Sequence, residues 1–387
     1  LFATTACSAE ATDPKKKVLV ISGPTGAGKS RLALEIAKRL NGEIVSADSV
    51  QVYRGLDIGS AKPSLLDRQE VPHHLIDILH PAEEYSVGQF YEDARKTTDG
   101  IISRGRIPII TGGTGLYLRW FIYGKPDVPK ASSEVTIEAH SELRGLEKTG
   151  DWDAAVRMLV EAGDPGVQSL SENDWYRLRR RLEILKSSGA PPSAFQVPYN
   201  TLKEKVQLRD HVSGSIGKEF EGSLDYEFIC FFLTTQRPDL YRSIDLRCET
   251  MILDGGILSE AKWLLDLGLF PSSSSATRAI GYRQAMEFLL MSREVEDWCS
   301  PRQVLGFLSR FQTASRNFAK RQLTWFRNDP IYHWIDASKP LETVVDFISE
   351  ACDDHGRGMI FRVPPSLAVE KDERDVRQLK SYRTRNR

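Results

Sequence analysis

The sequence predicts an α/β protein: a parallel β-sheet flanked by helices, with an all-helical domain inserted into it. Three observations support this fold. Over the first 120 residues, short apolar strands alternate with amphipathic helices, which is the pattern of a parallel sheet. Residues 125–224 lack strand patterns and are charged and helical. A new apolar stretch at 226–233 then provides a strand that can rejoin the sheet.

The first strand and helix enclose a glycine-rich loop. An apolar strand over 18–21 precedes residues 23–30, which match G-x-x-x-x-G-K-[ST], and a helix follows over 30–40. In such a loop, backbone N–H groups and the positive end of the helix bind phosphate oxygens. Lys29 adds a charge, and Ser30 can ligate Mg²⁺. The residues expected to bind a polyphosphate are Gly23, Thr25, Gly26, Ala27, Gly28, Lys29 and Ser30.

Two further turns are expected at the same edge of the sheet. A strand over 43–46 leads into Asp48, and a strand over 107–110 leads into residues 111–115. Ligands of parallel sheets bind at the carboxyl ends of the strands, so Asp48 is a candidate general base or metal contact. The second strand does not end in the aspartate that holds Mg²⁺ in most phosphate-loop hydrolases. This favours a loop that binds a polyphosphate as a leaving group or as an anchor, rather than a loop that serves ATP hydrolysis.

The remaining elements are mostly helical. Ser86 and Gln89 form a capping-box pattern at the start of a helix over 86–103. Further helices are predicted at 237–255, 257–267 and 280–291 and from Pro301 onward. In the long last helix, an apolar stripe is predicted to face the core: Val304, Phe307, Leu308, Phe311, Phe318 and Trp325.

Two groups of basic residues suggest a nucleic acid. Residues 302–328 contain basic side chains and no acid, and Arg177, Arg179, Arg180 and Arg181 crowd one helical turn. The net charge is −1, so any such surface must be a local patch. Solvated faces are the common explanation of charge runs. Two clusters in a neutral chain nevertheless favour contacts with a phosphate backbone.

Composition limits other classes of function. The five cysteines are scattered, so neither a zinc site nor a disulfide framework is predicted. His73 and His74 lack a third ligand at zinc spacing and are expected to be structural or to position a substrate. No apolar run approaches the roughly 20 residues that cross a bilayer, so no membrane contact is expected.

We expect five segments along the chain. Residues 1–16 are predicted to be disordered, 17–124 and 225–335 to form the catalytic core, 125–224 to form the helical insertion, and 336–387 to be a partly disordered extension. The expected location is the cytoplasm. A plastid or mitochondrion is the alternative, because the first 12 residues are rich in Ala, Ser and Thr. A monomer is expected.

Seven motifs in order resemble the tRNA dimethylallyltransferases, also called tRNA isopentenyltransferases. They are residues 23–30, 46–53, 57–63, 72–77, 112–117, 278–284 and 319–327. The resemblance implies a P-loop NTPase-like core, Mg²⁺, and a helical insertion that clamps the tRNA anticodon stem-loop. It also implies transfer of a dimethylallyl group from dimethylallyl diphosphate to the N6 amine of the adenosine 3′-adjacent to the anticodon.

The resemblance also assigns roles to residues. Asp48 is the implied base, Thr114 contacts the reacting adenine, and Arg247 binds diphosphate. The implied tRNA contacts are Ser49, Val50, Gln51, Tyr176, Arg177, Arg179, Arg180, Arg278, Gly281, Tyr282 and Arg283. The sequence departs from the family at Ser243, where an arginine is usual, with Arg242 as the candidate replacement. It also lacks the cysteines of the C-terminal zinc finger found in some eukaryotic relatives.

Three alternatives share parts of this pattern. An adenylate isopentenyltransferase of cytokinin biosynthesis would use the same donor with AMP, ADP or ATP as acceptor. A small-molecule P-loop kinase would use the loop for ATP. A non-catalytic RNA-binding protein would keep only the basic surfaces. The insertion and the motif at 319–327 argue against the first alternative, because a mononucleotide enzyme has little need for them.

Overall fold

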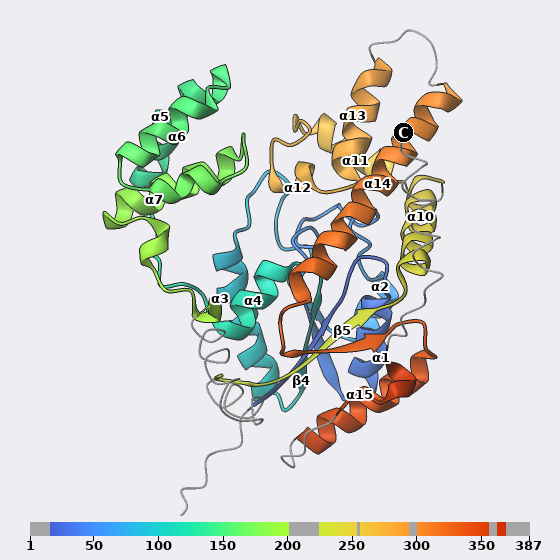
Figure 1. The fold of residues 1–387 in the computed structure, drawn as a ribbon. Helices are drawn as coiled ribbons and strands as arrows, with labels where there is room; N and C mark the ends of the chain where they lie inside the picture. The colour runs from blue at the N-terminus through green and yellow to red at the C-terminus, as the bar shows by residue number, and fades with distance from the viewer. Residues whose placement is uncertain (1–15, 201–223, 254–255, 294–299, 356–361, 369–387) are drawn as a thin grey trace, which may run out of the picture. The chain divides into compact units, whose positions relative to one another are not determined.

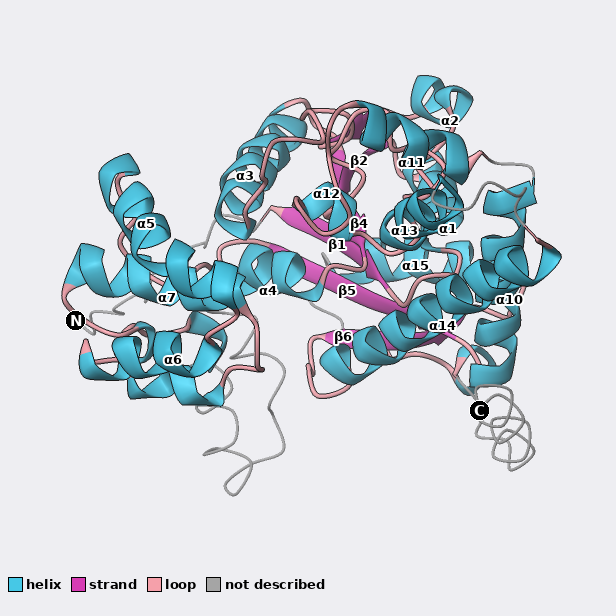
Figure 2. Cartoon of the chain, turned by 90° about the horizontal axis from the view of Figure 1, so that it is seen from above, coloured by secondary structure: helices cyan, strands magenta, loops and turns pink. Residues whose placement is uncertain are grey.

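A six-stranded parallel sheet forms the centre of the core, with strand order β3-β2-β4-β1-β5-β6 (Figures 1 and 2). In this computed structural model the described residues are 16–200, 224–253, 256–293, 300–355 and 362–368. The strands are β1 Lys17–Ser22, β2 Gly42–Ser46, β3 His73–His74, β4 Ile107–Gly112, β5 Glu227–Thr234 and β6 Tyr332–Asp336. The central strand β1 pairs with β4 on one side and β5 on the other, which confirms that the strand after the insertion rejoins the sheet.

Helices cover both faces of the sheet, with α1 and α15 on one face and α3 and α4 on the other (Figures 1 and 2). The core helices are α1 Lys29–Arg39, α2 Leu65–Glu70, α3 Val87–Ser103, α4 Gly115–Tyr123, α10 Arg237–Leu253, α11 Ile257–Asp266, α12 Ser275–Arg278, α13 Tyr282–Arg293, α14 Pro301–Phe326, α15 Leu341–His355 and the 3₁₀ turn η3 Pro365–Leu367. The predicted capping box at Ser86 and Gln89 is present at the start of α3. The α/β prediction is therefore confirmed.

The chain divides into two compact units, one from the described residues of Leu1–Ile122 and Glu221–Arg387 and the other from those of Tyr123–Phe220. The second unit contains α5 Ser133–Thr149, α6 Trp152–Glu161, η1 Pro165–Ser169, α7 Trp175–Ser188 and η2 Pro192–Ala194. It has a hydrophobic core of its own, which includes Leu143, Leu159 and Leu178.

The described residues after 331 contain a strand and a helix that were not identified from the sequence. β6 extends the sheet beside β5, and α15 packs on α1. Arg39 of α1 bonds to Glu342 and Asp346 of α15. Residues 1–16 were predicted to be disordered and residues 336–387 to be partly disordered. Most of the other residues in these two ranges lie outside the described part.

The apolar stripe of α14 was predicted only in part. Phe307 and Phe311 are buried, but Val304 and Trp325 are exposed. The buried face continues instead through Ser315, Ala319, Gln322, Leu323 and Phe326. Trp325 was wrongly assigned to the core; it lies beside the guanidinium of Arg119, whose Cζ is 4.0 Å from the ring centre.

None of the helices among the described residues combines the length and the apolar character that a bilayer crossing requires.

Replacing Ile348 by alanine tests whether α15 belongs to the folded core. Ile348 is fully buried, so Ile348→Ala should lower the free energy of unfolding by about 3 kcal/mol, the usual cost of such a cavity. Thr343→Ala, on the exposed side of the same helix, is the control and should change it little. Urea denaturation measures both. Equal effects of the two substitutions would contradict the assignment of α15 to the core.

Candidate active site

The glycine-rich loop lies between β1 and α1 and leaves the start of this helix available to an anion. Gly28, the residue before α1, has a φ of 84°, and no side chain caps the helix. Gly26 has a φ of 83°, and a Cβ there would lie 2.9 Å from Cγ1 of Ile244. The first backbone N–H groups of a helix have no partners within it, so this end of α1 suits a phosphate.

A cavity of about 360 Å³ lies beside the loop at the carboxyl edge of the sheet. It is lined by Thr25, Gly26, Gly28, Lys29, Ser30 and Arg247 of the predicted phosphate-binding set. Gly23 and Ala27 of that set are not among its lining residues. Asp48, Gln51 and residues 111–113 also line the cavity, so the three predicted turns meet at one place.

Two cations and one carboxylate converge in this cavity. Burial, and then the nearby positive charge of Arg247, lower the pKa of Lys29 to about 8, while Asp48 opposes the shift. Burial also lowers the pKa of Arg247, and Asp48 again opposes the effect. The Lys29 Nζ donates to the Pro24 carbonyl at 2.9 Å. Cations withdrawn from water in this way favour a ligand with several negative charges.

The turn after β2 brings Asp48 next to Thr114. An oxygen of the Asp48 carboxylate accepts a hydrogen bond from the Val50 N–H at 2.9 Å. The Thr114 hydroxyl accepts one from the Ser49 N–H at 3.2 Å, and the Thr114 N–H donates to the Ala47 carbonyl at 3.4 Å. The two predicted catalytic residues are therefore joined through neighbouring turns. Asp48 lines the cavity, whereas Thr114 is not among its lining residues.

Gln51 is buried and holds together two parts of the cavity wall. Its side-chain oxygen accepts from the Ser46 hydroxyl at 2.8 Å. Its amide nitrogen donates to the carbonyls of Ser60 and Ala61, both at 3.3 Å. Gln51 therefore connects the end of β2 to the loop over 57–63, and a contact of its side chain with tRNA stays a prediction.

The sequence analysis missed Gln322 on the buried face of α14. Its side-chain oxygen accepts from the Thr25 N–H at 2.9 Å, and its amide nitrogen donates to the Gly113 carbonyl at 3.0 Å. Gln322 therefore bridges the phosphate loop and the β4 turn, and it occupies the Thr25 N–H that was expected to face phosphate. A glutamine among the apolar residues of the buried stripe was the signal available in the sequence.

Comparisons with known proteins agree with one another. Residues 51–329 match the family model described as IPP transferase, and residues 16–73 match the model described as Isopentenyl transferase. The chain is 59% identical over 403 residues to tRNA dimethylallyltransferase 9 of Arabidopsis thaliana, covering 100% of this chain and 87% of that protein. The chain belongs to the IPP transferase family.

Solved structures of IPP transferases have the same fold. The crystal structure of the full-length tRNA isopentenylpyrophosphate transferase of Bacillus halodurans is 30% identical with a TM-score of 0.58, covering 89% of this chain and 99% of that one. A eukaryotic dimethylallyltransferase, crystallised acting on tRNA, has a TM-score of 0.65 at 24% identity, covering 95% of this chain and 84% of that one. The latter similarity concerns the fold alone.

Ser243 stands where other members of the IPP transferase family usually have an arginine, and its neighbour Arg242 points to a different environment from the cavity. The Arg242 side chain is 60% exposed and pairs with Asp239, and it is not among the lining residues of the cavity. Ser243 lines the cavity instead, and its hydroxyl donates to the Gly26 carbonyl at 3.0 Å. Ser243, and not Arg242, is therefore the residue of this pair that lies at the cavity. Arg31, which the sequence analysis did not single out, is a further cation that lines the cavity.

The predicted tRNA contacts on α7 differ in exposure. Tyr176 and Arg177 are exposed and Arg180 is half-buried, and Arg177 and Arg180 form ion pairs with Asp174 and Glu183 respectively. Arg179 is half-buried and bonds to His140 and to the Trp175 carbonyl. Arg181, which the sequence places in the same basic cluster, forms two bonds of 2.6 Å to the fully buried Asp164. Its role is therefore structural, and the cluster does not form a single basic face.

The predicted contacts around α13 also differ. Arg278 and Arg283 are exposed at either end of the turn between α12 and α13. Gly281 and Tyr282 are buried, and the Tyr282 hydroxyl donates to Glu260 at 2.7 Å. A side chain in this position supports the surrounding loops. The contact of Tyr282 with tRNA stays a prediction that its burial does not favour.

The pH dependence of anion binding tests the electrostatics of Lys29. Because the pKa of Lys29 is lowered to about 8, its positive charge should be present below this pH and lost above it. The affinity for inorganic pyrophosphate should therefore fall for the wild type, relative to Lys29→Arg, as pH rises from 7 to 10. Calorimetric titration measures the affinity of both proteins for pyrophosphate at each pH. The ionisation of pyrophosphate affects both affinities equally, so it cancels in their ratio. Parallel pH profiles would contradict the lowered pKa.

Proposed function

We propose that this protein transfers a dimethylallyl group from dimethylallyl diphosphate to the N6 amine of the adenosine 3′-adjacent to the anticodon in tRNA. Membership of the IPP transferase family and the activities after which its relatives are named support a prenyl transfer to tRNA. The observation that carries the proposal is the convergence of the phosphate loop, two half-buried cations and Asp48 in one cavity. Transfer of a prenyl group from a diphosphate to an amine needs positive charge for the leaving diphosphate and a base for the amine proton, and this combination provides both.

In the proposed reaction a carbon–nitrogen bond forms while a carbon–oxygen bond breaks. The N6 nitrogen attacks the first carbon of the dimethylallyl group, and the diphosphate leaves with the bonding electron pair. Negative charge grows on the departing oxygen, where the N–H groups at the start of α1, Lys29 and Arg247 would stabilise it. Arg31 lines the same cavity and would add to the positive potential at the diphosphate.

Asp48 would accept the proton that the nitrogen loses. The N6 lone pair is delocalised into the adenine ring, so the amine is a poor nucleophile and gains from a base as the new bond forms. The free carboxylate oxygen of Asp48 is available for this, since the other accepts from the Val50 N–H. Thr114 would orient the adenine beside it. The base must leave its stack to reach the cavity.

Mg²⁺ would bind jointly with the diphosphate. The described residues contain no group of three or more His, Cys, Asp or Glu side chains that could hold a metal alone. The Ser30 hydroxyl lines the cavity and is a hard oxygen donor, whereas Asp48, as the base, would reach the metal only through water. Magnesium sites commonly use one or two such groups together with substrate phosphates and water. The donor set therefore fits a metal that neutralises charge on the leaving diphosphate.

Transfer of a labelled donor tests the proposed function directly. Purified protein is incubated with Mg²⁺ and dimethylallyl diphosphate labelled in its alkyl chain, with unmodified tRNA, with tRNA in which the adenosine beside the anticodon is replaced, or with AMP. The proposal predicts label on unmodified tRNA alone. Label on AMP alone would support an adenylate isopentenyltransferase. Phosphate transfer from labelled ATP, without alkyl transfer, would support a kinase.

Asp48→Asn tests the assignment of the base. Asparagine keeps the size of the side chain and an oxygen for the Val50 N–H, but it cannot accept the proton. The single-turnover rate should fall by about 10²–10⁴-fold, the usual contribution of general base catalysis. The dissociation constant for tRNA should change little. Asp266→Asn, at an exposed position of α11, is the control. An unchanged single-turnover rate for Asp48→Asn would remove Asp48 from the mechanism.

A further inference from the structure

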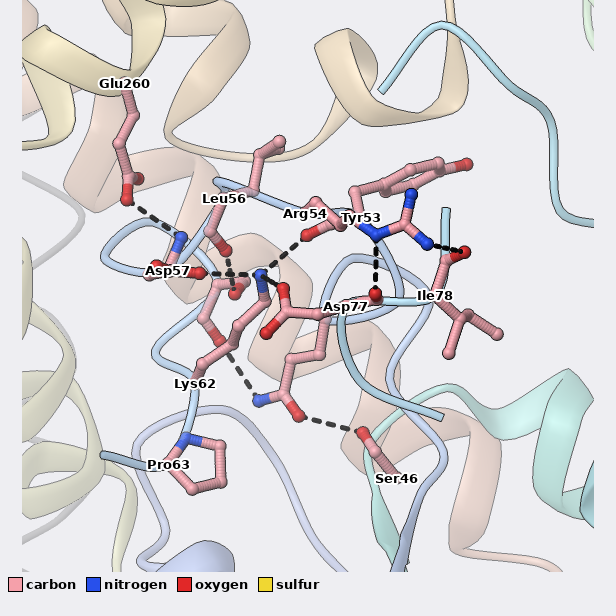
Figure 3. A network of polar contacts seen from close by, with 12 residues as sticks. Ser46, Tyr53, Arg54, Leu56, Asp57, Lys62, Pro63, Asp77, Ile78 and Glu260 are labelled. Carbon is pink, nitrogen blue, oxygen red and sulfur yellow. Dashed lines mark hydrogen bonds and ion pairs between the residues drawn. The ribbon is translucent and has the colours of Figure 1, made fainter. Parts of the chain in front are cut away.

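Glu260 of α11 binds a distant loop through both oxygens of its carboxylate. One oxygen accepts hydrogen bonds from the N–H groups of Asp57 and Ile58, each at 2.8 Å. The other accepts from the Gly59 N–H at 3.1 Å and from the Tyr282 hydroxyl at 2.7 Å. Figure 3 shows Glu260 reaching toward Asp57. One side chain thus holds three successive backbone amides and the first residue of α13.

The loop that Glu260 holds forms part of the active-site wall. Ser60, Ala61 and Pro63 line the cavity directly after the three bonded amides. The loop is also held by Lys62, whose side chain is only 1% exposed and whose Nζ donates to Asp57 and Asp77 at 2.7 and 2.5 Å (Figure 3). This part of the wall is therefore positioned by charge-assisted hydrogen bonds, which are stronger and more directional than neutral ones.

The same loop is bonded to the turn that carries Asp48. The carbonyls of Ser60 and Ala61 accept from the Gln51 amide, and the oxygen of that amide accepts from the Ser46 hydroxyl. Ser46 is the last residue of β2, two positions before Asp48. A path of hydrogen bonds, joined by the backbone of the loop, therefore runs from Glu260 to the end of β2, which leads to the candidate base.

The other end of this path is residues 278–283, which join the end of α12 to the start of α13 and are called the α12–α13 segment here. Tyr282 bonds to Glu260 there, and the exposed side chains of Arg278 and Arg283 flank it in the sequence. Two exposed cations beside a fixed turn suit the phosphate backbone of the proposed tRNA substrate. The position of this segment and the position of the cavity wall therefore depend on the same carboxylate.

We propose that Glu260 is a positioning residue for prenyl transfer. It fixes the position of the loop over 57–61 relative to the α12–α13 segment. Through Gln51, it also fixes the position of the turn that carries Asp48. Tyr282 supplies the link from this segment. Glu260 does not touch the reacting atoms, and the proposal rests on the proposed function for the identity of the reaction. It explains why Tyr282, inside a segment expected to contact tRNA, is buried and bonded inward.

Tyr282→Phe is the sharpest variant for this proposal. It removes the hydroxyl that bonds to Glu260 and keeps the ring that packs there. Tyr226→Phe is a matched control, because the buried Tyr226 also donates to a carboxylate, at 2.9 Å to Asp99, and does not line the cavity. Single-turnover rates with labelled dimethylallyl diphosphate and saturating tRNA are compared, and melting temperatures are recorded for every protein.

Positioning predicts a specific set of rates. Tyr282→Phe should be about 10-fold slower than wild type and Glu260→Ala about 100-fold slower, as small misplacements of catalytic groups can cause. The KM for dimethylallyl diphosphate should stay within about twofold, because the phosphate loop is unaffected. The double variant should be no slower than Glu260→Ala, because both changes act on one link. A wild-type rate for Tyr282→Phe, an equal loss for Tyr226→Phe, or multiplied effects in the double variant would overturn the proposal.

Hydrogen exchange gives a readout that does not depend on the reaction. Backbone amides 57–59 should exchange faster in Glu260→Ala than in wild type, and so should Ser49 and Val50 in the Asp48 turn. Unchanged exchange at Ser49 and Val50 would overturn the link to the base. If wild-type protein fails to prenylate tRNA but the exchange pattern holds, the proposed function is wrong, and the structural link from Glu260 to the Asp48 turn stands.

Discussion

The active site depends on the close approach of backbone segments at the carboxyl edge of the sheet. A Cβ at Gly112 would lie 2.2 Å from the Ala47 carbonyl oxygen, so only glycine allows β4 and the turn after β2 to come this near. Gln322 then bonds to both the phosphate loop and the β4 turn. These contacts set the distance between the anion-binding end of α1 and the carboxylate of Asp48, on which the proposed chemistry depends.

This packing also creates an electrostatic imbalance that a ligand can relieve. Burial lowers the pKa of Lys29 and of Arg247, and the nearby positive charge of Arg247 lowers the pKa of Lys29 further. A single carboxylate offsets part of this repulsion. A diphosphate with Mg²⁺ would offset the rest. The charged groups of the site are therefore most stable when the anion is bound.

Much of the fold and of the site was predictable because it rests on local patterns. The phosphate loop, the Asp48 turn and the strand after the insertion each follow from a few adjacent residues. Gln322 was missed because its importance comes from two loops distant in sequence. The structural role of Arg181 depends on the buried Asp164, and that of Tyr282 on Glu260, and neither pairing has a sequence signal. The edge strand β6 is only five residues long, so its pattern was weak.

A crystal structure of this protein with dimethylallyl diphosphate and Mg²⁺ would test the central claim most directly. The account predicts the diphosphate against the backbone N–H groups of residues 26–30, with Lys29 and Arg247 in contact and the alkyl carbon that bears the leaving oxygen turned toward Asp48. A donor whose diphosphate lies elsewhere in the protein, with the loop unoccupied, would contradict it.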